Sequence, residues 1–316
     1  MTLAFLFPGQ GSQSPGMAKA IADASSAARA VLDEIDDALG QKLSNLMFEG
    51  PGDELTLTEN AQPALMAASL AVMASLKADH GVEVTAASYV AGHSLGEYSA
   101  LAAAGALTIA DAARLLRVRG RAMQAAVPVG EGAMAALLGA EMNQVLDACA
   151  VARSKGVCDI ANDNAPGQIV ISGAKEAVEA AIAAVRELGV RKAMLLPVSA
   201  PFHCALMQPA AEVMSEALET AAINAPKVPV VANVSAEPTD DPETIRNQLV
   251  AQVTGRVRWR ESIAFMADAG VTRMAEAGAG KVLTGMLKRA APDVEEIALN
   301  GPEDLAAFAG ALEGAS

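Results

Sequence analysis

The segment Gly92–Gly96, which reads G-H-S-L-G, is the sequence feature that most constrains the fold. It matches the pattern G-x-S-x-G, in which a buried strand turns sharply into a helix and exposes a serine at the corner. Ser88–Ala91 has the character of the strand, and Glu97–Ala103 that of the helix. Glycines suit such a turn because side chains there would collide with neighbouring backbone. This context favours the sharp turn over an ordinary glycine-flanked loop, and it predicts an α/β fold.

Strand and helix patterns alternate through the N-terminal part of the chain. Leu3–Phe7 is an apolar run of only five residues, which predicts a buried strand rather than a signal peptide. Helical periodicity follows at Ser25–Leu39 and Gln62–Asp79, and Thr108 begins a helix with Asp111 at the capping-box position. We therefore expect a large α/β-hydrolase-like domain with a parallel sheet.

A different order, strand-helix-strand-strand-helix-strand, occupies the middle of the chain. Its segments are Ala133–Leu138, Asn143–Ala152, Cys158–Ala161, Gln168–Ser172, Lys175–Leu188 and Arg191–Val198. This βαββαβ order is typical of a ferredoxin-like domain. Past Pro201 the first pattern resumes, with a helix at Leu206–Ala222 and a strand at Val228–Asn233. We predict a large catalytic domain of residues 1–130 and 199–316, an inserted small domain of residues 131–198, and a cleft between them.

Charge and cysteine content limit the partners and the compartment. The formal net charge of −14 argues against binding to nucleic acid or to an anionic membrane, and no apolar run reaches membrane-spanning length. Cys149, Cys158 and Cys204 are too few for a disulfide framework, and no cluster of His, Cys, Asp and Glu has the spacing of metal ligands. We expect a cytoplasmic monomer without a metal.

A serine nucleophile needs a base at neutral pH, and the chain has three histidines. His80 lies at a predicted helix end, where an imidazolium complements the helix dipole. His93 precedes Ser94 on the turn, where successive side chains diverge. His203 lies in a proline-containing loop at the return from the small domain, a place where catalytic groups are commonly held. His203 is therefore the predicted base, and a hydrogen-bonded structural histidine is the alternative.

Arg119 differs from the other arginines of its predicted helix. Arg114, Arg117 and Arg121 are three and four positions apart and form a polar stripe. The residues three and four positions from Arg119 are Leu115, Leu116, Ala122 and Met123. Its charge therefore projects from the apolar side, which is costly unless the charge is paired. Two partners stay open, a buried acid of the chain and the carboxylate of a bound ligand.

Six segments, in this order along the chain, resemble the malonyl-CoA:acyl carrier protein transacylases, a family that loads malonyl groups for fatty-acid synthesis. They are Phe7–Gln13, Gly92–Tyr98, Arg119-Gly120, Asn162–Gly173, Phe202-His203 and Gly280–Gly285. The resemblance implies that Ser94 is the nucleophile, His203 its base and Arg119 the partner of the malonyl carboxylate. It also implies an oxyanion hole made by the backbone N–H groups of Leu95 and Gln10.

The resemblance further implies that Gln252 orients His203 through its main-chain carbonyl. The reaction would move the malonyl group from malonyl-CoA to the phosphopantetheine thiol of acyl carrier protein through a malonyl-serine ester, without a cofactor. Methylmalonyl stays open as an alternative group. Lys281, Lys288 and Arg289 are candidates for carrier-protein docking, and a solvated helix face is the alternative for them.

Two rival functions are weighed against this one. A serine hydrolase shares the turn and the fold class, but it normally has an acid between serine and histidine in chain order and has no need of a buried arginine. A carrier-binding module without catalysis has no need of Ser94 and His203. Intact mass after incubation with malonyl-CoA separates the three functions, because only a transferase keeps a malonyl adduct.

Overall fold

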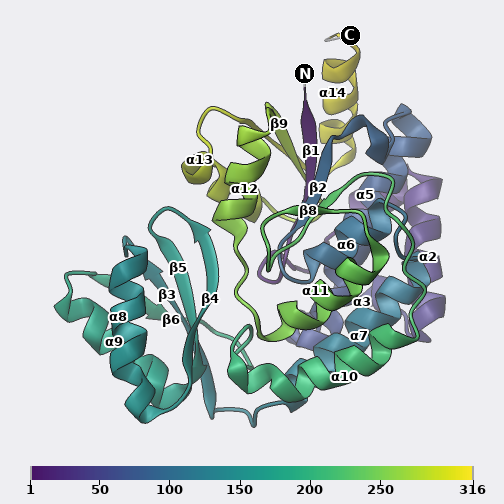
Figure 1. The fold of residues 1–316 in the computed structure, drawn as a ribbon. Coiled ribbons are helices and arrows are strands. Elements are labelled where there is room, and N and C mark those ends of the chain that lie inside the picture. The colour runs from purple at the N-terminus through teal and green to yellow at the C-terminus, as the bar shows by residue number, and fades with distance from the viewer. Residues whose placement is uncertain (1, 315–316) are drawn as a thin grey trace.

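The computed structural model describes residues 2–314, and within them the strands form two separate sheets (Figure 1). The large sheet has the order β10-β9-β1-β2-β7-β8 and is parallel except where β8 pairs with β7. Its strands are β1 (Leu3–Phe7), β2 (Tyr89–Gly92), β7 (Val230–Val231), β8 (Pro238–Thr239), β9 (Arg273–Ala277) and β10 (Glu295–Leu299). The predicted large domain with a parallel sheet is confirmed.

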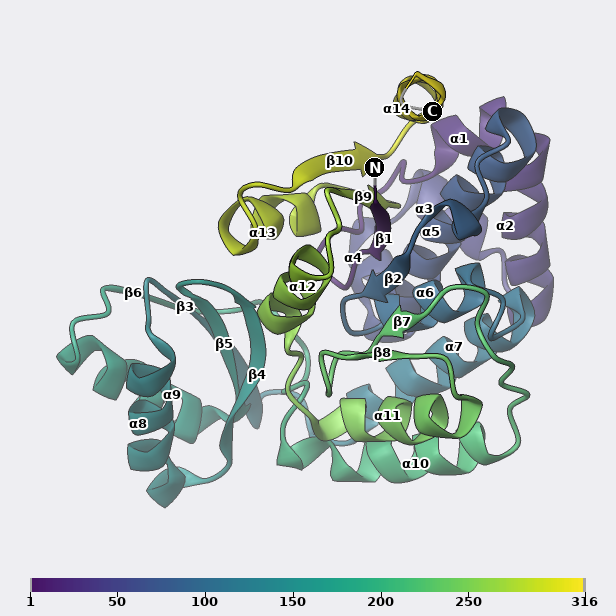
Figure 2. The same cartoon turned by 45° about the horizontal axis from the view of Figure 1, so that its top comes forward.

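Helices cover both faces of the large sheet (Figures 1 and 2). They are α1 (Lys19–Ala24), α2 (Ser26–Leu39), α3 (Leu43–Glu49), α4 (Gly52–Thr56), α5 (Thr58–His80), α6 (Gly96–Ala103), α7 (Ile109–Ala125), α10 (Gln208–Glu219), α11 (Pro242–Thr254), α12 (Trp259–Asp268), α13 (Val282–Ala290) and α14 (Pro302–Glu313). Side chains of β1 alternate between two cores. Phe5 belongs to the core that includes residues of α2, α5 and α7, and Leu6 belongs to the core that includes residues of α12 and α13. All of β1 is buried, as in parallel sheets covered on both faces.

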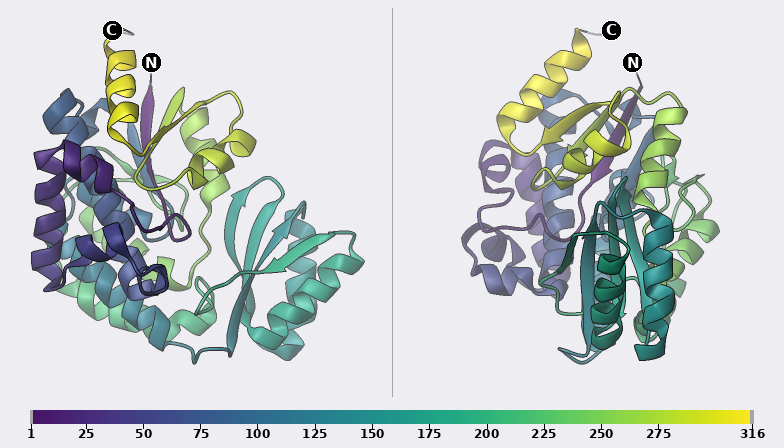
Figure 3. Two further views of the ribbon diagram at one scale, coloured as in Figure 1. Left: turned by 180° about the vertical axis from the view of Figure 1, so that it is seen from behind. Right: turned by 90° about the vertical axis from the view of Figure 1, so that its left-hand side faces the viewer.

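The small sheet is antiparallel, with the order β4-β5-β3-β6. Its elements are β3 (Gly132–Leu138), α8 (Met142–Ala152), β4 (Cys158–Ala165), β5 (Gln168–Ala174), α9 (Lys175–Glu187) and β6 (Lys192–Leu195). Both helices lie on the face turned away from the large sheet (Figure 3). Leu137 and Ile171 pack beneath them, whereas Met134 and Val170 point to the opposite face. The predicted βαββαβ order is confirmed, and the domain limits at 130/131 and 198/199 stay a prediction.

Three predicted strands differ from the structure by four residues each, more than the others do. β6 ends at Leu195 and not at Val198. Leu196 still donates its N–H to Met134 of β3, but the N–H of Val198 donates to the carbonyl oxygen of Leu196 and leaves the ladder. β4 extends to Ala165 through two bulges that a simple alternation pattern does not reveal. β7 has only two residues, because the chain turns back after it to form β8.

β4 of the small sheet is joined to α12 and to the segment that leads into it. Asp163 donates its backbone N–H to Val257 and pairs through its carboxylate with Arg260 of α12 at 2.7 Å. Val257 in turn donates to Ala161. Short 3-10 turns complete the structure at Val84–Ala86, Arg153–Lys155 and Ala205–Met207. Within residues 2–314, no helix combines the length and the apolar character needed to cross a bilayer.

Candidate active site

Ser94 lies on a sharp turn between β2 and α6, as the sequence predicts. The turn brings backbone segments so close that a Cβ on Gly92 would lie 1.8 Å from the carbonyl oxygen of Gly96. A Cβ on Gly96 would lie 2.2 Å from the carbonyl oxygen of Phe7. Ser94 itself has φ +54°, which costs energy for a residue with a side chain. The surrounding structure therefore holds the half-buried serine in a strained backbone conformation at the pocket.

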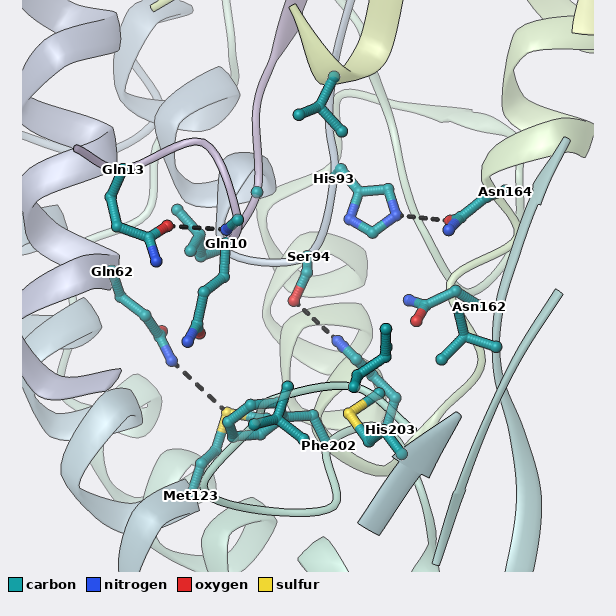
Figure 4. Close-up of a pocket in the computed structure, with 18 of the residues that line it drawn as sticks. Gln10, Gln13, Gln62, His93, Ser94, Met123, Asn162, Asn164, Phe202 and His203 are labelled. Carbon is teal, nitrogen blue, oxygen red and sulfur yellow. Dashed lines mark hydrogen bonds between the residues drawn. The ribbon is translucent and has the colours of Figure 1, made fainter. Parts of the chain in front are cut away.

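His203 lies within hydrogen-bond distance of the serine (Figure 4). Its Nε2 is 2.7 Å from Ser94 Oγ, and its Nδ1 is 2.9 Å from the carbonyl oxygen of Gln252 and 3.2 Å from that of Gly255. Because two carbonyls accept at Nδ1, that nitrogen carries the proton and Nε2 faces the hydroxyl as an acceptor. Burial, with the nearby charge of Arg119, lowers the pKa of His203 to about 3. The imidazole is thus neutral at physiological pH.

The other two histidines lie outside this contact. His93 Nε2 is 2.8 Å from Oδ1 of Asn164 (Figure 4). The His93 ring also meets the Trp259 ring edge-on. Burial lowers the pKa of His93. His80 is the last residue of α5, where Gly81 caps the helix in a left-handed conformation. Of the three histidines, His203 is the one whose ring lies within hydrogen-bond distance of Ser94 Oγ, and its role as the base stays a prediction.

Arg119 is buried on α7, with 1% of its surface exposed. Its Nη1 donates to Gln62 Oε1 at 2.8 Å, and its Nη2 donates to Gln252 Oε1 at 2.9 Å and to Ser94 Oγ at 3.2 Å. The guanidinium carbon also lies 5.9 Å from the centre of the Tyr98 ring. Over residues 2–314 the arginine makes no direct ion pair, and its Nε is buried without a partner. A direct Asp or Glu partner, one of the two open alternatives, is absent.

The loop after β1 and the turn after β2 leave the same edge of the sheet, because these parallel strands are neighbours. His93 donates its backbone N–H to Phe7, and a Cβ on Gly9 would lie 2.7 Å from the carbonyl oxygen of His93. Gln10, the next residue, lines the same pocket as Ser94 and Leu95. The N–H of Ser94 already donates to Oδ1 of Asn233 at 2.7 Å. Any backbone donor to a developing oxyanion must therefore come from another residue.

A polar network beneath the turn has no counterpart in the sequence predictions. Asn233 is fully buried, and its Nδ2 donates to the carbonyl oxygen of Gly92 at 2.7 Å. Glu97 Oε2 accepts from the backbone of Asn233 at 3.0 Å and from Gln252 Nε2 at 2.8 Å. Burial raises the pKa of Glu97 to about 7, although these hydrogen bonds and Arg119 oppose the shift. Asn233 lies just beyond the end of β7, and no local pattern of the sequence marks it as a site residue.

The pocket above Ser94 has a volume of about 380 Å³ and lies between the two sheets. The large part of the chain contributes Ser94 and Arg119 to its wall, and the small sheet contributes Met134, Asn162 and Val170. The wall is mainly apolar, and its charged group is Arg119. Such a pocket suits a short acyl group with one anionic end.

The basic residues considered for docking lie within or immediately before α13, a helix that contributes to the pocket wall. Val282 and Met286 of α13 line the pocket, and Lys281 immediately precedes this helix. Lys288, farther along α13, pairs with Glu296 at 3.1 Å and is largely exposed. Within residues 2–314 no group of three or more His, Cys, Asp or Glu side chains is arranged to hold a metal ion.

Comparison with known proteins gives consistent matches over nearly the whole chain. A family model described as an acyl transferase domain matches residues 4–304. Malonyl CoA-acyl carrier protein transacylase of Bacillus subtilis is 46% identical over 306 residues, covering 96% of this chain and 95% of that protein. The Escherichia coli K12 protein of the same name is 45% identical over 304 residues, covering 96% of this chain and 97% of its own length.

Solved structures match equally well. The acyl-carrier-protein-S-malonyltransferase of Bartonella henselae is 54% identical, has a TM-score of 0.97 and covers 99% of this chain, which covers 100% of that one. A malonyl-transacylase in complex with its holo type II PKS acyl-carrier protein is 41% identical, with a TM-score of 0.95. This chain covers 100% of that transacylase, which covers 98% of this chain.

Proposed function

The chain belongs to the acyl transferase family, and on that premise we propose that it transfers malonyl groups from malonyl-CoA to the phosphopantetheine thiol of acyl carrier protein. The observation that carries the proposal is the position of one hydroxyl. Ser94 Oγ lies 2.7 Å from His203 Nε2 and 3.2 Å from Arg119 Nη2. A base and a cation for a carboxylate thus meet at the same nucleophile.

Acylation follows from this arrangement. His203 takes the hydroxyl proton as Ser94 Oγ attacks the thioester carbon, and the neutral imidazole with its Nδ1 proton fixed is prepared for this transfer. Gln252 serves as the positioning residue, because its carbonyl holds the ring where other enzymes use an acid. The backbone N–H groups of Gln10 and Leu95 are the proposed donors to the oxyanion. Coenzyme A then leaves with the proton from His203.

Arg119 selects the acyl group. In the free enzyme Arg119 Nη2 donates one hydrogen to Ser94 Oγ. Acylation converts this hydroxyl oxygen into an ester oxygen, which is a weaker hydrogen-bond acceptor. The released N–H, together with another N–H of the guanidinium, suits the two oxygens of a carboxylate. A malonyl group places its carboxylate two bonds from the reacting carbonyl, within reach of a guanidinium that already touches the serine.

The second half-reaction reverses the first on a different thiol. The carrier's phosphopantetheine thiol gives its proton to His203 and attacks the malonyl-serine ester, and Ser94 Oγ leaves with that proton returned from His203. Because two thioesters of similar energy are exchanged, we propose that no cofactor takes part. A cytoplasmic location, where both thiol carriers are found, is part of the same proposal.

A two-stage labelling experiment tests this function. The protein is incubated with malonyl-CoA labelled in the malonyl group, freed of excess substrate, and then mixed with holo acyl carrier protein. The expected result is label on the protein that moves to the carrier. Release of free malonate in the first stage would identify a hydrolase, and failure to acquire any label would identify a binding module.

A further inference from the structure

Glu97 is a buried acid that the proposed reaction does not use. It is 2% exposed and lies in the first turn of α6, three residues after Ser94. Its Oε2 accepts hydrogen bonds from the backbone N–H of Asn233 and from Gln252 Nε2. The carboxylate is therefore held in a fixed position beneath the nucleophile rather than placed at the surface.

The side-chain amide of Gln252 connects this acid to Arg119. Gln252 Nε2 donates to Glu97 at 2.8 Å, while Gln252 Oε1 accepts from Arg119 Nη2 at 2.9 Å. The amide has one orientation that satisfies both neighbours, since its NH₂ end must face the carboxylate and its oxygen must face the guanidinium. Glu97 thereby fixes the orientation of the Gln252 amide. The amide oxygen in turn fixes the position of Arg119 Nη2, the nitrogen that also contacts Ser94.

Charge balance then changes when an acyl carboxylate enters. With His203 neutral, the buried network of the free protein contains one cation, Arg119, and one acid, Glu97. A carboxylate bound to Arg119 adds a second negative charge to a region that excludes water. Two carboxylates that share one cation favour protonation of one of them.

We propose that Glu97 is a positioning residue of the acyl pocket, which orients Arg119 through Gln252 and takes up one proton from solvent when the acyl carboxylate binds. This inference rests on the proposed function. It couples the binding of a charged acyl group to the uptake of a proton by Glu97. Malonyl groups should load with net proton uptake, whereas a neutral acyl group should load without it.

Other charged groups near α6 are placed less closely. Arg119 of α7 is the charged group that acts on Glu97, and Tyr98 is its titratable neighbour on α6, where burial raises the pKa of the phenol. The remaining titratable groups of the packed elements α5, α7 and β2 are Glu59, Lys77, Asp79, His80, Tyr89, Asp111, Arg114, Arg117 and Arg121, and all are exposed or half-buried. Burial lowers the pKa of both His93 and His203, so the protonated form of each imidazole is disfavoured.

The test compares kcat/KM for malonyl and acetyl transfer between about pH 6 and about pH 9 in the unmodified protein and in Glu97→Gln. Because His203 serves both substrates, its titration cancels in the malonyl-to-acetyl ratio. One linked proton should lower the ratio by up to about tenfold per pH unit above the titration of Glu97. In Glu97→Gln, whose amide oxygen still accepts both hydrogen bonds, the ratio should not change with pH.

Glu276→Gln is the matched control. Glu276 is also fully buried, and burial raises its pKa, but it does not itself line the pocket and makes no hydrogen bond to Arg119 or Gln252. It accepts from the backbone N–H groups of Leu283 and Thr284 at the start of α13. This variant should keep the pH dependence of the unmodified protein. A ratio that is flat in the unmodified protein, or equally steep in Glu97→Gln, would overturn the inference.

A direct measurement covers the case in which Glu97→Gln does not fold. Calorimetry of Ser94→Ala with malonyl-CoA and with acetyl-CoA, in two buffers of different ionisation enthalpy, counts the protons taken up. Extra uptake with malonyl-CoA supports the inference, and equal uptake contradicts it. Absence of any malonyl transfer in the unmodified protein at every pH would refute the proposed function instead, so the two failures are distinguishable.

Discussion

Replacement of Arg119 by alanine tests how the protein selects its acyl group. The substitution removes a guanidinium that is 1% exposed and donates to Gln62, Gln252 and Ser94. A carboxylate left without this desolvated, charge-assisted contact loses about 2–5 kcal/mol. Malonyl transfer should therefore fall by roughly 30-fold to 5,000-fold. Acetyl transfer has no carboxylate to lose and should fall much less.

The assay is kcat/KM for both thioesters, measured together with the melting temperature. Some loss of stability is expected because the amide oxygens of Gln62 and Gln252 lose a donor, each at a cost of about 1–3 kcal/mol. Arg119→Lys keeps a charge but cannot keep three contacts in a planar fork, so its malonyl-to-acetyl ratio should lie between those of the other two proteins. An unchanged ratio in a folded Arg119→Ala protein would refute the role assigned to this residue.

Three further predictions concern the base, the turn and pH. His203→Ala should lower malonyl transfer by about 100-fold to 10,000-fold in a folded protein, and an equal loss in His93→Ala, measured in parallel, would contradict the assignment of the base. Gly96→Ala should lower the melting temperature strongly, because its Cβ would lie 2.2 Å from the carbonyl oxygen of Phe7. Gly310→Ala is the control, since no atom lies within 4 Å of the added Cβ. Equal melting temperatures of the two variants would contradict the close approach at Gly96. Burial raises the pKa of Glu97 from 4.5 to about 7, so the free energy of unfolding should fall as pH rises through that range. Denaturant titrations should show a smaller fall in Glu97→Gln. An identical pH profile in the two proteins would contradict this prediction.

The residues that the sequence could identify each have a local signal. Ser94 lies in a five-residue motif, and Arg119 interrupts an apolar helix face whose burial can be read from its neighbours. His203 was found by elimination among three histidines. The order of strands and helices could also be predicted from the sequence. β1 is a continuous apolar run, and along the strands of the small sheet the side chains alternate between the face under the helices and the opposite face.

The network beneath the turn could not be found in this way. Asn233, whose Oδ1 accepts a hydrogen bond from the backbone N–H of Ser94, lies 139 residues from it along the chain. Gln252 lies 155 residues from Glu97. A buried polar side chain far along the chain has no periodic pattern, because its burial depends on the tertiary fold. The partner of Arg119 could not be predicted for the same reason. The sequence allows a directly paired acid or a ligand carboxylate, whereas in the structure Glu97 is connected to Arg119 through the amide of Gln252.

Detection of the acyl-enzyme tests the central claim most directly. The protein and its Ser94→Ala variant are incubated with malonyl-CoA, and intact and peptide masses are recorded. A malonyl adduct should form on the peptide that contains Ser94, be absent from the variant, and disappear when holo acyl carrier protein is added. An adduct of undiminished yield in Ser94→Ala would contradict the assignment of Ser94 as the nucleophile.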